Sequence, residues 1–126
     1  MPVIHLDTNI LIAIAAPESP LRIELQRWLA QGFSVAVSAM TWAEFKCGPA
    51  SPEFIEAWRV LLVDRIVPID QTLAELAAAL FNQTGRRSRS LPDCLVAATA
   101  IHSDAQLATL NRSDFDLFAK FGLVLR

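Results

Sequence analysis

The stretch Val3-Ile4-His5-Leu6-Asp7-Thr8-Asn9-Ile10-Leu11 decides the fold of this chain. Its first part, Val3 to Leu6, is an apolar run that predicts a buried strand. The run ends in an acid, Asp7, and is followed by a short predicted helix over 9–16 that Pro17 ends. An acid at the carboxyl end of a buried strand lies where open α/β sheets bind their ligands. We therefore expect Asp7 to belong to a functional site.

The rest of the chain repeats this alternation of strand and helix. Two helix starts are marked by Ser19-Pro20 and Ser51-Pro52, because serine caps a helix and proline suits its first position. Further strands are expected at 33–37, 65–69, 106–109 and 123–125. Further helices are expected at 20–31, 40–46, 52–62, 71–83, 91–102 and 113–120. Mostly apolar strands predict an α/β/α sandwich with a mostly parallel central sheet of about five strands, and 1–126 fits a single domain.

Composition limits the classes of function. The formal net charge is −2, so binding to nucleic acid would need a local basic patch. Cys47 and Cys94 have neither metal-ligand nor redox spacing, which favours a reducing, cytoplasmic compartment. We expect no signal peptide and no membrane association, since no apolar run reaches the roughly 18 residues that span a bilayer. Hydrophobic residues form 53% of the chain, which indicates that a partner covers some apolar surface.

Four acids occupy comparable places in the predicted fold. Asp7 and Asp114 follow strands, Asp93 lies in the first turn of a helix, and Glu44 lies in the helix after the second strand. In a parallel sheet, strand ends and the starts of the following helices gather at one edge. The four carboxylates are therefore expected to converge.

Convergence of carboxylates requires a cation. Two carboxylates roughly 4 Å apart repel by about 4 kcal/mol at an effective dielectric near 20, so both stay ionised only if a cation joins them. Mg²⁺ or Mn²⁺ suits carboxylate oxygens and keeps several bound waters. The chemistry that fits is metal-assisted phosphodiester hydrolysis.

A plainer interpretation treats these acids as caps and surface residues. An acid in a helix's first turn, such as Asp93, is stabilised by the helix dipole alone, and Glu44 by itself would be an ordinary surface residue. Asp7 fits this interpretation least, because an acid that closes a buried strand needs a partner. The set of acids together favours a metal site.

Four pieces of the sequence carry a resemblance to a known family. They are Leu6-Asp7-Thr8-Asn9, Ala43-Glu44, Pro92-Asp93-Cys94-Leu95-Val96-Ala97-Ala98-Thr99-Ala100 and Thr109-Leu110-Asn111-Arg112-Ser113-Asp114-Phe115. In this order and spacing, the chain resembles the PIN-domain ribonucleases, and most closely the VapC-type toxins of type II toxin–antitoxin pairs. The resemblance implies a PIN fold and a Mg²⁺- or Mn²⁺-dependent endoribonuclease that cleaves RNA. It also implies a homodimer that a small cognate antitoxin protein inhibits.

The resemblance also implies roles for individual residues. Asp7, Glu44 and Asp93 would be catalytic metal ligands, and Asn9 and Thr109 would order the site around them.

The fourth acid departs from a single family pattern. Some members carry an acid where this chain has Asn111, and others use the acid three residues later, which here is Asp114. Because a carboxylate offsets metal charge and an amide does not, we expect Asp114 to complete the catalytic metal site. Asn111 is then expected to lie just outside the ligands, and Asp116 is a further candidate.

Basic residues near the acids have two interpretations. Arg86, Arg87 and Arg89 precede Asp93, and their guanidinium groups could hold RNA phosphates at the rim of the site. They could equally form an exposed loop that charge keeps soluble. Arg112 has the same two interpretations beside the fourth acid.

Two other functions compete with this prediction. A haloacid-dehalogenase-type phosphatase also begins with an aspartate after its first strand, but it uses a second aspartate two residues later, where this chain has Asn9. A non-catalytic PIN-like module would only bind a partner. The presence of Asp7, Glu44 and Asp93 argues against that second alternative.

Overall fold

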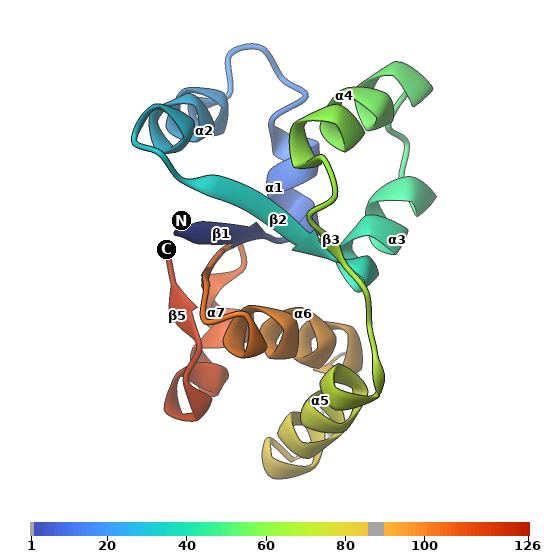
Figure 1. The fold of residues 1–126 in the computed structure, drawn as a ribbon, viewed down its shortest axis with the longest axis vertical. Helices are drawn as coiled ribbons and strands as arrows, with labels where there is room; N and C mark the ends of the chain where they lie inside the picture. Colours follow the sequence, from blue (N-terminus) through green and yellow to red (C-terminus); the bar gives the residue numbers. More distant parts are fainter. Residues whose placement is uncertain (1, 86–89) are drawn as a thin grey trace.

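Five parallel strands form the central layer of the structure (Figure 1). The structure is a computed structural model that describes residues 2–85 and 90–126. Within them the strands are β1 (Val3–Leu6), β2 (Ser34–Ser38), β3 (Ile66–Val67), β4 (Gln106–Ala108) and β5 (Val124–Leu125). They lie in the order β3-β2-β1-β4-β5, and every neighbouring pair is parallel. The predicted parallel sheet of about five strands is confirmed.

Helices cover both faces of this sheet (Figure 1). One face carries α1 (Thr8–Ala13), α2 (Pro20–Ala30), α3 (Ala39–Cys47) and α4 (Pro52–Leu62). The other carries α5 (Gln71–Gln83), α6 (Ser90–His102), α7 (Arg112–Phe115) and the 3₁₀ helix η1 (Asp116–Phe121). None of the helices in the described residues is long and apolar enough to cross a membrane.

The central position of β1 creates the place for a site. Ile4 pairs with Val35 of β2 on one side and with Gln106 of β4 on the other. The chain builds β2 and β3 outward in one direction and β4 and β5 outward in the other. The strand order therefore reverses at β1, and in open α/β sheets ligands bind outside the carboxyl ends of the strands at such a reversal.

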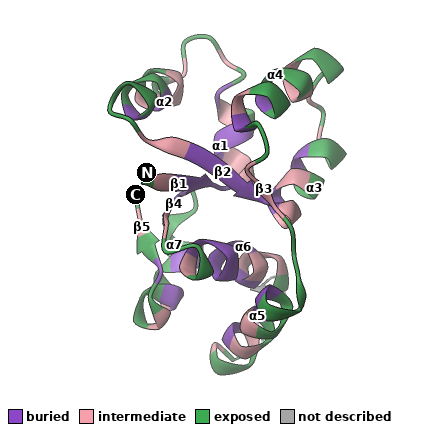
Figure 2. Cartoon of the chain, viewed as in Figure 1, coloured by how far each residue is buried: buried purple, intermediate pink, exposed green. Residues whose placement is uncertain are grey.

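Each face of the sheet has its own hydrophobic core (Figure 2). On one face Leu6 packs with Phe45 of α3 and Trp58 of α4, and all three are buried. On the other, Leu107 packs with Phe118 of η1. Burial of each large apolar side chain contributes roughly 1.5–3 kcal/mol, so the strands are held by both layers.

Three predicted elements differ from the structure by more than one residue at an end or in the type of helix. The helix predicted over 9–16 ends at Ala13, and the carbonyl of Ile14 just beyond it accepts a hydrogen bond from Nη2 of Arg22 at 2.8 Å. The strand predicted over 65–69 is only Ile66–Val67, because Pro68 has no N–H to donate to a sheet.

The third difference is the helix predicted over 113–120, which is α7 followed by the 3₁₀ helix η1. Side chains three residues apart line up along a 3₁₀ helix. Phe115 and Phe118 have this spacing, and both are buried in the same core. The tighter winding thus brings both rings to the sheet.

An unusual turn connects α4 to β3. Val63 has φ 57° and ψ −113°, and the N–H of Arg65 donates to the carbonyl of Leu62 at 2.9 Å. These are the features of a type II′ turn with Val63 at its second position, where glycine is preferred. A β-branched residue with positive φ is strained, and the Val63 side chain is exposed. No apolar burial offsets the strain.

We expect Val63→Gly to raise the free energy of unfolding by about 1 kcal/mol, because relief of backbone strain exceeds the entropic cost of glycine. Val60→Gly is the matched control, since Val60 is an equally exposed valine within α4. That change should lower the free energy of unfolding by about 0.5 kcal/mol. Urea denaturation measures both, and two changes of the same sign would contradict the assignment of strain to Val63.

Candidate metal centre

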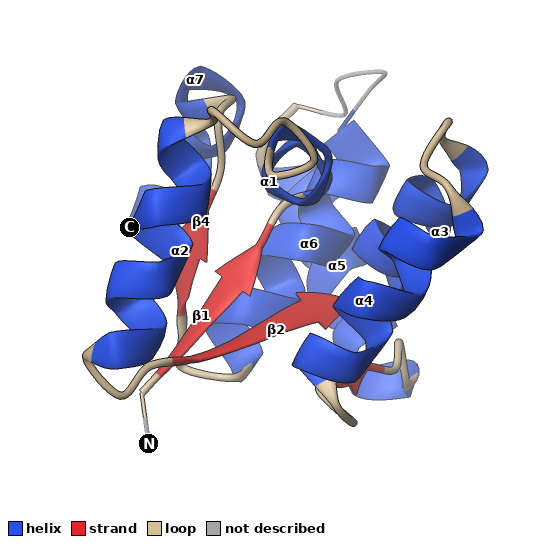
Figure 3. Cartoon of the chain, turned by 90° about the horizontal axis from the view of Figure 1, so that it is seen from above, coloured by secondary structure: helices blue, strands red, loops and turns tan. Residues whose placement is uncertain are grey.

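Asp7 lies at the carboxyl end of β1 and caps the N-terminus of α1. Figure 3 shows β1 leading directly into α1, beside the end of β4. The Asp7 carboxylate accepts three hydrogen bonds. Oδ1 accepts from the backbone N–H of Thr8 at 2.8 Å. Oδ2 accepts from Oγ1 of Thr109 at 2.8 Å and from Nδ2 of Asn9 at 3.3 Å. These hydrogen bonds fix the carboxylate in place. Asp7 as a whole is buried, with 7% of its surface exposed.

Asn9 and Thr109 bind each other as well as Asp7. Nδ2 of Asn9 also lies 3.5 Å from Oγ1 of Thr109, and Oδ1 of Asn9 accepts from the N–H of Leu110 at 3.1 Å. The N–H of Asn111 donates to Oγ1 of Thr109 at 3.0 Å. Both predicted ordering residues thus contact the Asp7 carboxylate and join the segment after β4 to the segment after β1.

Glu44 reaches the same edge from α3. Its side chain is exposed, and its Oε1 accepts a hydrogen bond from Oγ1 of Thr8 at 2.9 Å. Thr8 therefore touches both Asp7 and Glu44. No separate role was predicted for Thr8 from the sequence. The signal for one was the presence of a hydroxyl side chain directly after Asp7.

The fourth acid lies near Asp7 at the start of α7. The negative charge of Asp114 raises the pKa of Asp7, which places the two carboxylates within electrostatic reach. Asn111 precedes α7 and makes no side-chain capping bond with it. Asp116 begins η1 and is exposed. Among the three candidates, Asp114 is the one that acts on Asp7 electrostatically.

The pKa of Asp7 is raised from its ordinary value of 3.8. Burial is the largest cause, because it disfavours the charged carboxylate. The hydrogen bonds from Thr109, Thr8 and Asn9 lower the pKa and offset part of the shift, whereas Asp114 raises it further. The salt bridges within the described residues join Arg27 to Glu24 and Arg59 to Glu56, and neither lies at Asp7. A cation at this edge would therefore relieve a real electrostatic cost.

The donor set suits a hard divalent cation. Carboxylate, amide and hydroxyl oxygens are the ligands that Mg²⁺ and Mn²⁺ prefer. Asp93 is half-buried in the first turn of α6. Across residues 2–85 and 90–126, no three His, Cys, Asp or Glu side chains stand close enough to form a ready-made metal-binding group. Closure on a metal would need movement of an exposed side chain, and Asp114 is exposed.

Histidine is a poor candidate for this centre. Burial lowers the pKa of His5 to about 4, so its ring is uncharged at neutral pH and cannot neutralise the carboxylates. Alternation along β1 directs His5 to the opposite face of the sheet from Ile4 and Leu6. The site is therefore built from oxygen donors.

The predicted basic residues are placed only in part. Arg86, Arg87 and Arg89 lie outside the described residues. Nη1 of Arg112 donates to the backbone oxygen of Arg126 at 2.8 Å. This contact holds the Arg112 side chain against Arg126, the residue that follows β5.

The raised pKa of Asp7 gives a pH dependence to stability. A carboxyl whose folded-state pKa is raised binds its proton more tightly in the folded state, so its contribution is full below pH 3.8 and is lost as pH rises through the folded pKa. In a metal-chelating buffer, the free energy of unfolding of the wild type should fall relative to Asp7→Asn as pH rises from about 3.5 to 7. Urea denaturation across this range measures both proteins, and a wild type that gains stability relative to Asp7→Asn as pH rises would contradict the shift.

The sequence is similar to those of known proteins. The family model of the PIN domain matches residues 4–120. Ribonuclease VapC10 of Mycobacterium tuberculosis is 38% identical over 87 residues, which span 67% of this chain and 65% of that protein.

Solved structures give the same architecture. A toxin–antitoxin complex from Klebsiella pneumoniae contains a chain with TM-score 0.71 and 30% identity, with 89% of each chain covered. The FitAcB structure from Neisseria gonorrhoeae has TM-score 0.73 and 24% identity, with 98% of this chain and 96% of that chain covered, and it shows a shared fold. The family match over residues 4–120, together with the parallel sheet and the acids at its carboxyl edge, shows that the chain belongs to the PIN-domain family.

Proposed function

We propose that residues 1–126 act as one PIN domain, a cytoplasmic Mg²⁺- or Mn²⁺-dependent endoribonuclease that serves as the toxin of a toxin–antitoxin pair. The observation that carries this proposal is the buried Asp7 carboxylate. Three donors fix it, no salt bridge in the described residues neutralises it, and further acids lie beside it. The proposal draws further support from a 38% identical relative that is named a ribonuclease.

The four acids would hold the metal: Asp7, Glu44, Asp93 and Asp114. When bound, a divalent cation would polarise a phosphoryl oxygen of the RNA and activate a water molecule for attack. Thr109 and Asn9 keep the Asp7 carboxylate aimed at this edge, since both donate to its Oδ2. The exposed carboxylates of Glu44 and Asp114 would complete the set of ligands and would orient the water that attacks the phosphodiester bond.

RNA phosphates would be held by basic side chains beside the acids. Arg86, Arg87 and Arg89 directly precede α6, which carries Asp93 in its first turn. Cationic groups at this point would offset the repulsion between RNA and a chain of net charge −2. Arg112 is the weaker candidate, because its guanidinium group already binds the backbone of Arg126.

A substitution of Asp7 tests the activity. Asp7→Asn should lower RNA cleavage by more than about 100-fold, because the loss of a ligand's charge exceeds the roughly 10–100-fold effect of losing a residue that only supports a ligand. Asp104→Asn is the matched control: Asp104 is exposed, precedes β4 at the opposite edge of the sheet, and has φ 53°, which asparagine tolerates.

The assay follows a labelled RNA with Mg²⁺, Mn²⁺ or a chelator. Cleavage by the wild type and by Asp104→Asn should require the metal, and cleavage by Asp7→Asn should be absent. Equal rates for the wild type and Asp7→Asn would contradict the proposed site. A wild type that binds a partner but never cleaves RNA would instead favour a non-catalytic PIN-like module.

A metal-dependent phosphatase fits the geometry less well. That chemistry needs a second acid at the position of Asn9. Here the amide is used at both ends, since Nδ2 donates to Asp7 and Oδ1 accepts from the N–H of Leu110. An aspartate could not make the first of these contacts.

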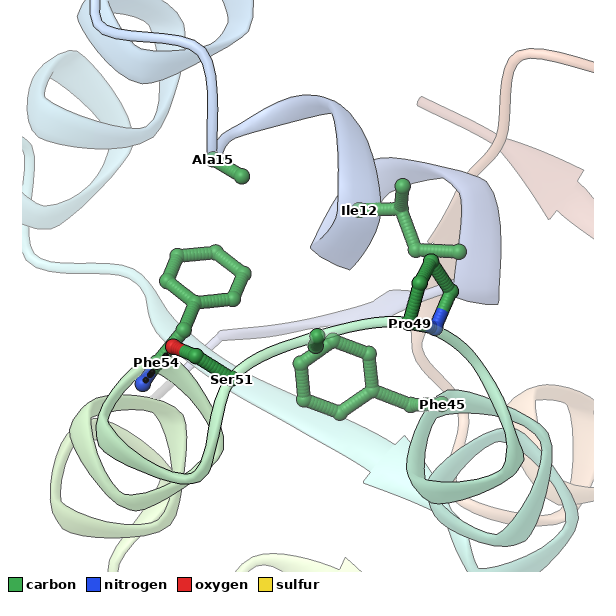
Figure 4. A pocket seen from close by; sticks show the side chains of 7 residues that line it. Ile12, Ala15, Phe45, Pro49, Ser51 and Phe54 are labelled. Atoms are coloured by element: carbon green, nitrogen blue, oxygen red, sulfur yellow. Dashed lines mark hydrogen bonds between the residues drawn. The ribbon is translucent and has the colours of Figure 1, made fainter.

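The antitoxin is proposed to bind an apolar pocket beside the acids (Figure 4). The pocket has a volume of about 380 Å³ and lies between α1, α3 and the start of α4. Its lining residues are Ile12, Ala15, Phe45, Pro49, Ala50, Ser51 and Phe54. An amphipathic helix of a partner can place its apolar face in such a groove. Because α1 and α3 also carry Thr8 and Glu44, that helix could direct a basic side chain to the metal site.

The toxin–antitoxin complex from Klebsiella pneumoniae, which contains a chain 30% identical to this one, supports the idea of a protein partner. A homodimer is the second part of the proposal. Val60 and Val63 are exposed apolar residues on α4 and the turn after it, and a second copy would cover such surface. Sedimentation of the isolated chain as a monomer would contradict the homodimer.

A charge in the pocket should weaken antitoxin binding. Ile12 lines the pocket and is 44% exposed, so Ile12→Glu should leave the fold intact and weaken binding roughly 30-fold, as for loss of a central apolar contact. Ile23→Glu is the control, because Ile23 is exposed on α2 outside the pocket lining. Titration calorimetry with the purified antitoxin measures both, and equal affinities would place the interface elsewhere.

A further inference from the structure

We infer that Thr8 is a positioning residue that orients Glu44 for metal binding through its hydroxyl group. The inference rests on the proposed function and names a residue to which neither the sequence motif nor the acid cluster assigned a role. Its basis is the 2.9 Å hydrogen bond from Oγ1 of Thr8 to Oε1 of Glu44. The two residues lie 36 positions apart in the sequence, so the contact joins two separate helices.

The use of the Thr8 hydroxyl differs from that of Thr84, which caps the C-terminus of α5, and of Thr99 within α6. Oγ1 of Thr84 donates to the carbonyl of Leu80 at 2.7 Å, and Oγ1 of Thr99 donates to the carbonyl of Leu95 at 2.8 Å. Both bonds run back four residues, which is the usual behaviour of threonine in a helix. Thr8 is the first residue of α1 and has no preceding helical turn. Its hydroxyl is therefore available to another element.

Glu44 needs such a partner to have a defined orientation. Its side chain is exposed, and a free glutamate side chain samples many rotamers that must be given up when it binds a metal. Within residues 2–85 and 90–126, the Glu44 carboxylate accepts its hydrogen bond from Thr8. That bond engages Oε1 and leaves Oε2 available for a cation.

Thr8 also connects Glu44 to Asp7. Its backbone N–H donates to Oδ1 of Asp7 at 2.8 Å, while its hydroxyl donates to Glu44. One residue thus sets the relative positions of two carboxylates from α1's cap and from α3. Residues that orient metal ligands in this way change metal affinity by roughly 10–100-fold when removed.

The hydroxyl can be removed without disturbing the contact to Asp7. Thr8→Val keeps the backbone N–H and the branched shape, and it deletes only the donor to Glu44. Thr8→Ser keeps the donor and serves as the rescue variant. Thr72→Val is the matched control, because Thr72 is an exposed threonine in the first turn of α5, far from the acids in sequence.

The first measurement is Mn²⁺ binding to the isolated full chain, followed by electron paramagnetic resonance of the free ion. Thr8→Val should weaken Mn²⁺ binding about 10-fold, the lower end of the range because Glu44 is exposed. Thr8→Ser and Thr72→Val should bind within about twofold of the wild type. Thermal unfolding in a chelator should give similar midpoints for all four proteins, which separates a local effect from loss of the fold.

A double-mutant cycle shows whether Thr8 acts through Glu44. In a Glu44→Ala background, measured at millimolar Mn²⁺, the further change Thr8→Val should have no effect. The same 10-fold loss with and without Glu44 would overturn the inference, as would wild-type affinity in Thr8→Val. A wild type that binds no Mn²⁺ and cleaves no RNA would overturn the proposed function itself, whereas an active wild type with an equally tight Thr8→Val variant overturns only the role of Thr8.

Discussion

The hydrogen bond between Thr109 and the Asp7 carboxylate is the interaction on which the rest of the site depends. It joins residues 102 positions apart at 2.8 Å and lies in the buried interior. A carboxylate taken out of water without partners carries a large cost. Here the cost is reduced by donors from both neighbouring segments, and the residual cost is visible in the raised pKa of Asp7. The residues that follow β1 and β4 thus fix the position of the carboxylate. A bound cation would reduce its remaining desolvation cost and its repulsion with Asp114.

The repulsion between the acids is confined to one edge of the sheet. The formal charge of the whole chain is only −2, yet Asp7, Glu44 and Asp114 gather near one sheet edge. A parallel sheet produces this arrangement without special sequence devices, because every strand delivers the residue after it to the same side. The two hydrophobic cores hold the strands in register from both faces. The apolar run of a strand therefore contributes to stability, and the polar residue that follows it contributes to the chemistry of the site.

Most of the fold could be predicted from the sequence, because its elements were encoded locally, and the same local patterns pointed to the acids of the candidate site. Val3 to Leu6 predicted β1, and the serine–proline pairs predicted the starts of α2 and α4, which Ser19 and Ser51 cap through their hydroxyl groups. The remainder depended on contacts between distant residues. The end of α1 is followed by a carbonyl that Arg22 binds, and Thr8 acquires its partner only when α3 packs beside α1. The backbone of Val63 could not be predicted either, since valine gives no signal for positive φ.

The strand order has a consequence for when the site can form during synthesis. Within this domain β1 is translated before the other strands, and β2 can pair with it early. The pairing with β4 must await residues 106–108, since Ile4 lies beside Gln106 and Leu6 beside Ala108. Thr109 and Asp114 emerge later still, and the entropy of closing a loop of about 100 residues must be overcome before Asp7 meets them. A nascent chain can therefore pair its first strands while the proposed site still lacks Thr109 and Asp114, so completion of that site waits until most of the domain has been translated.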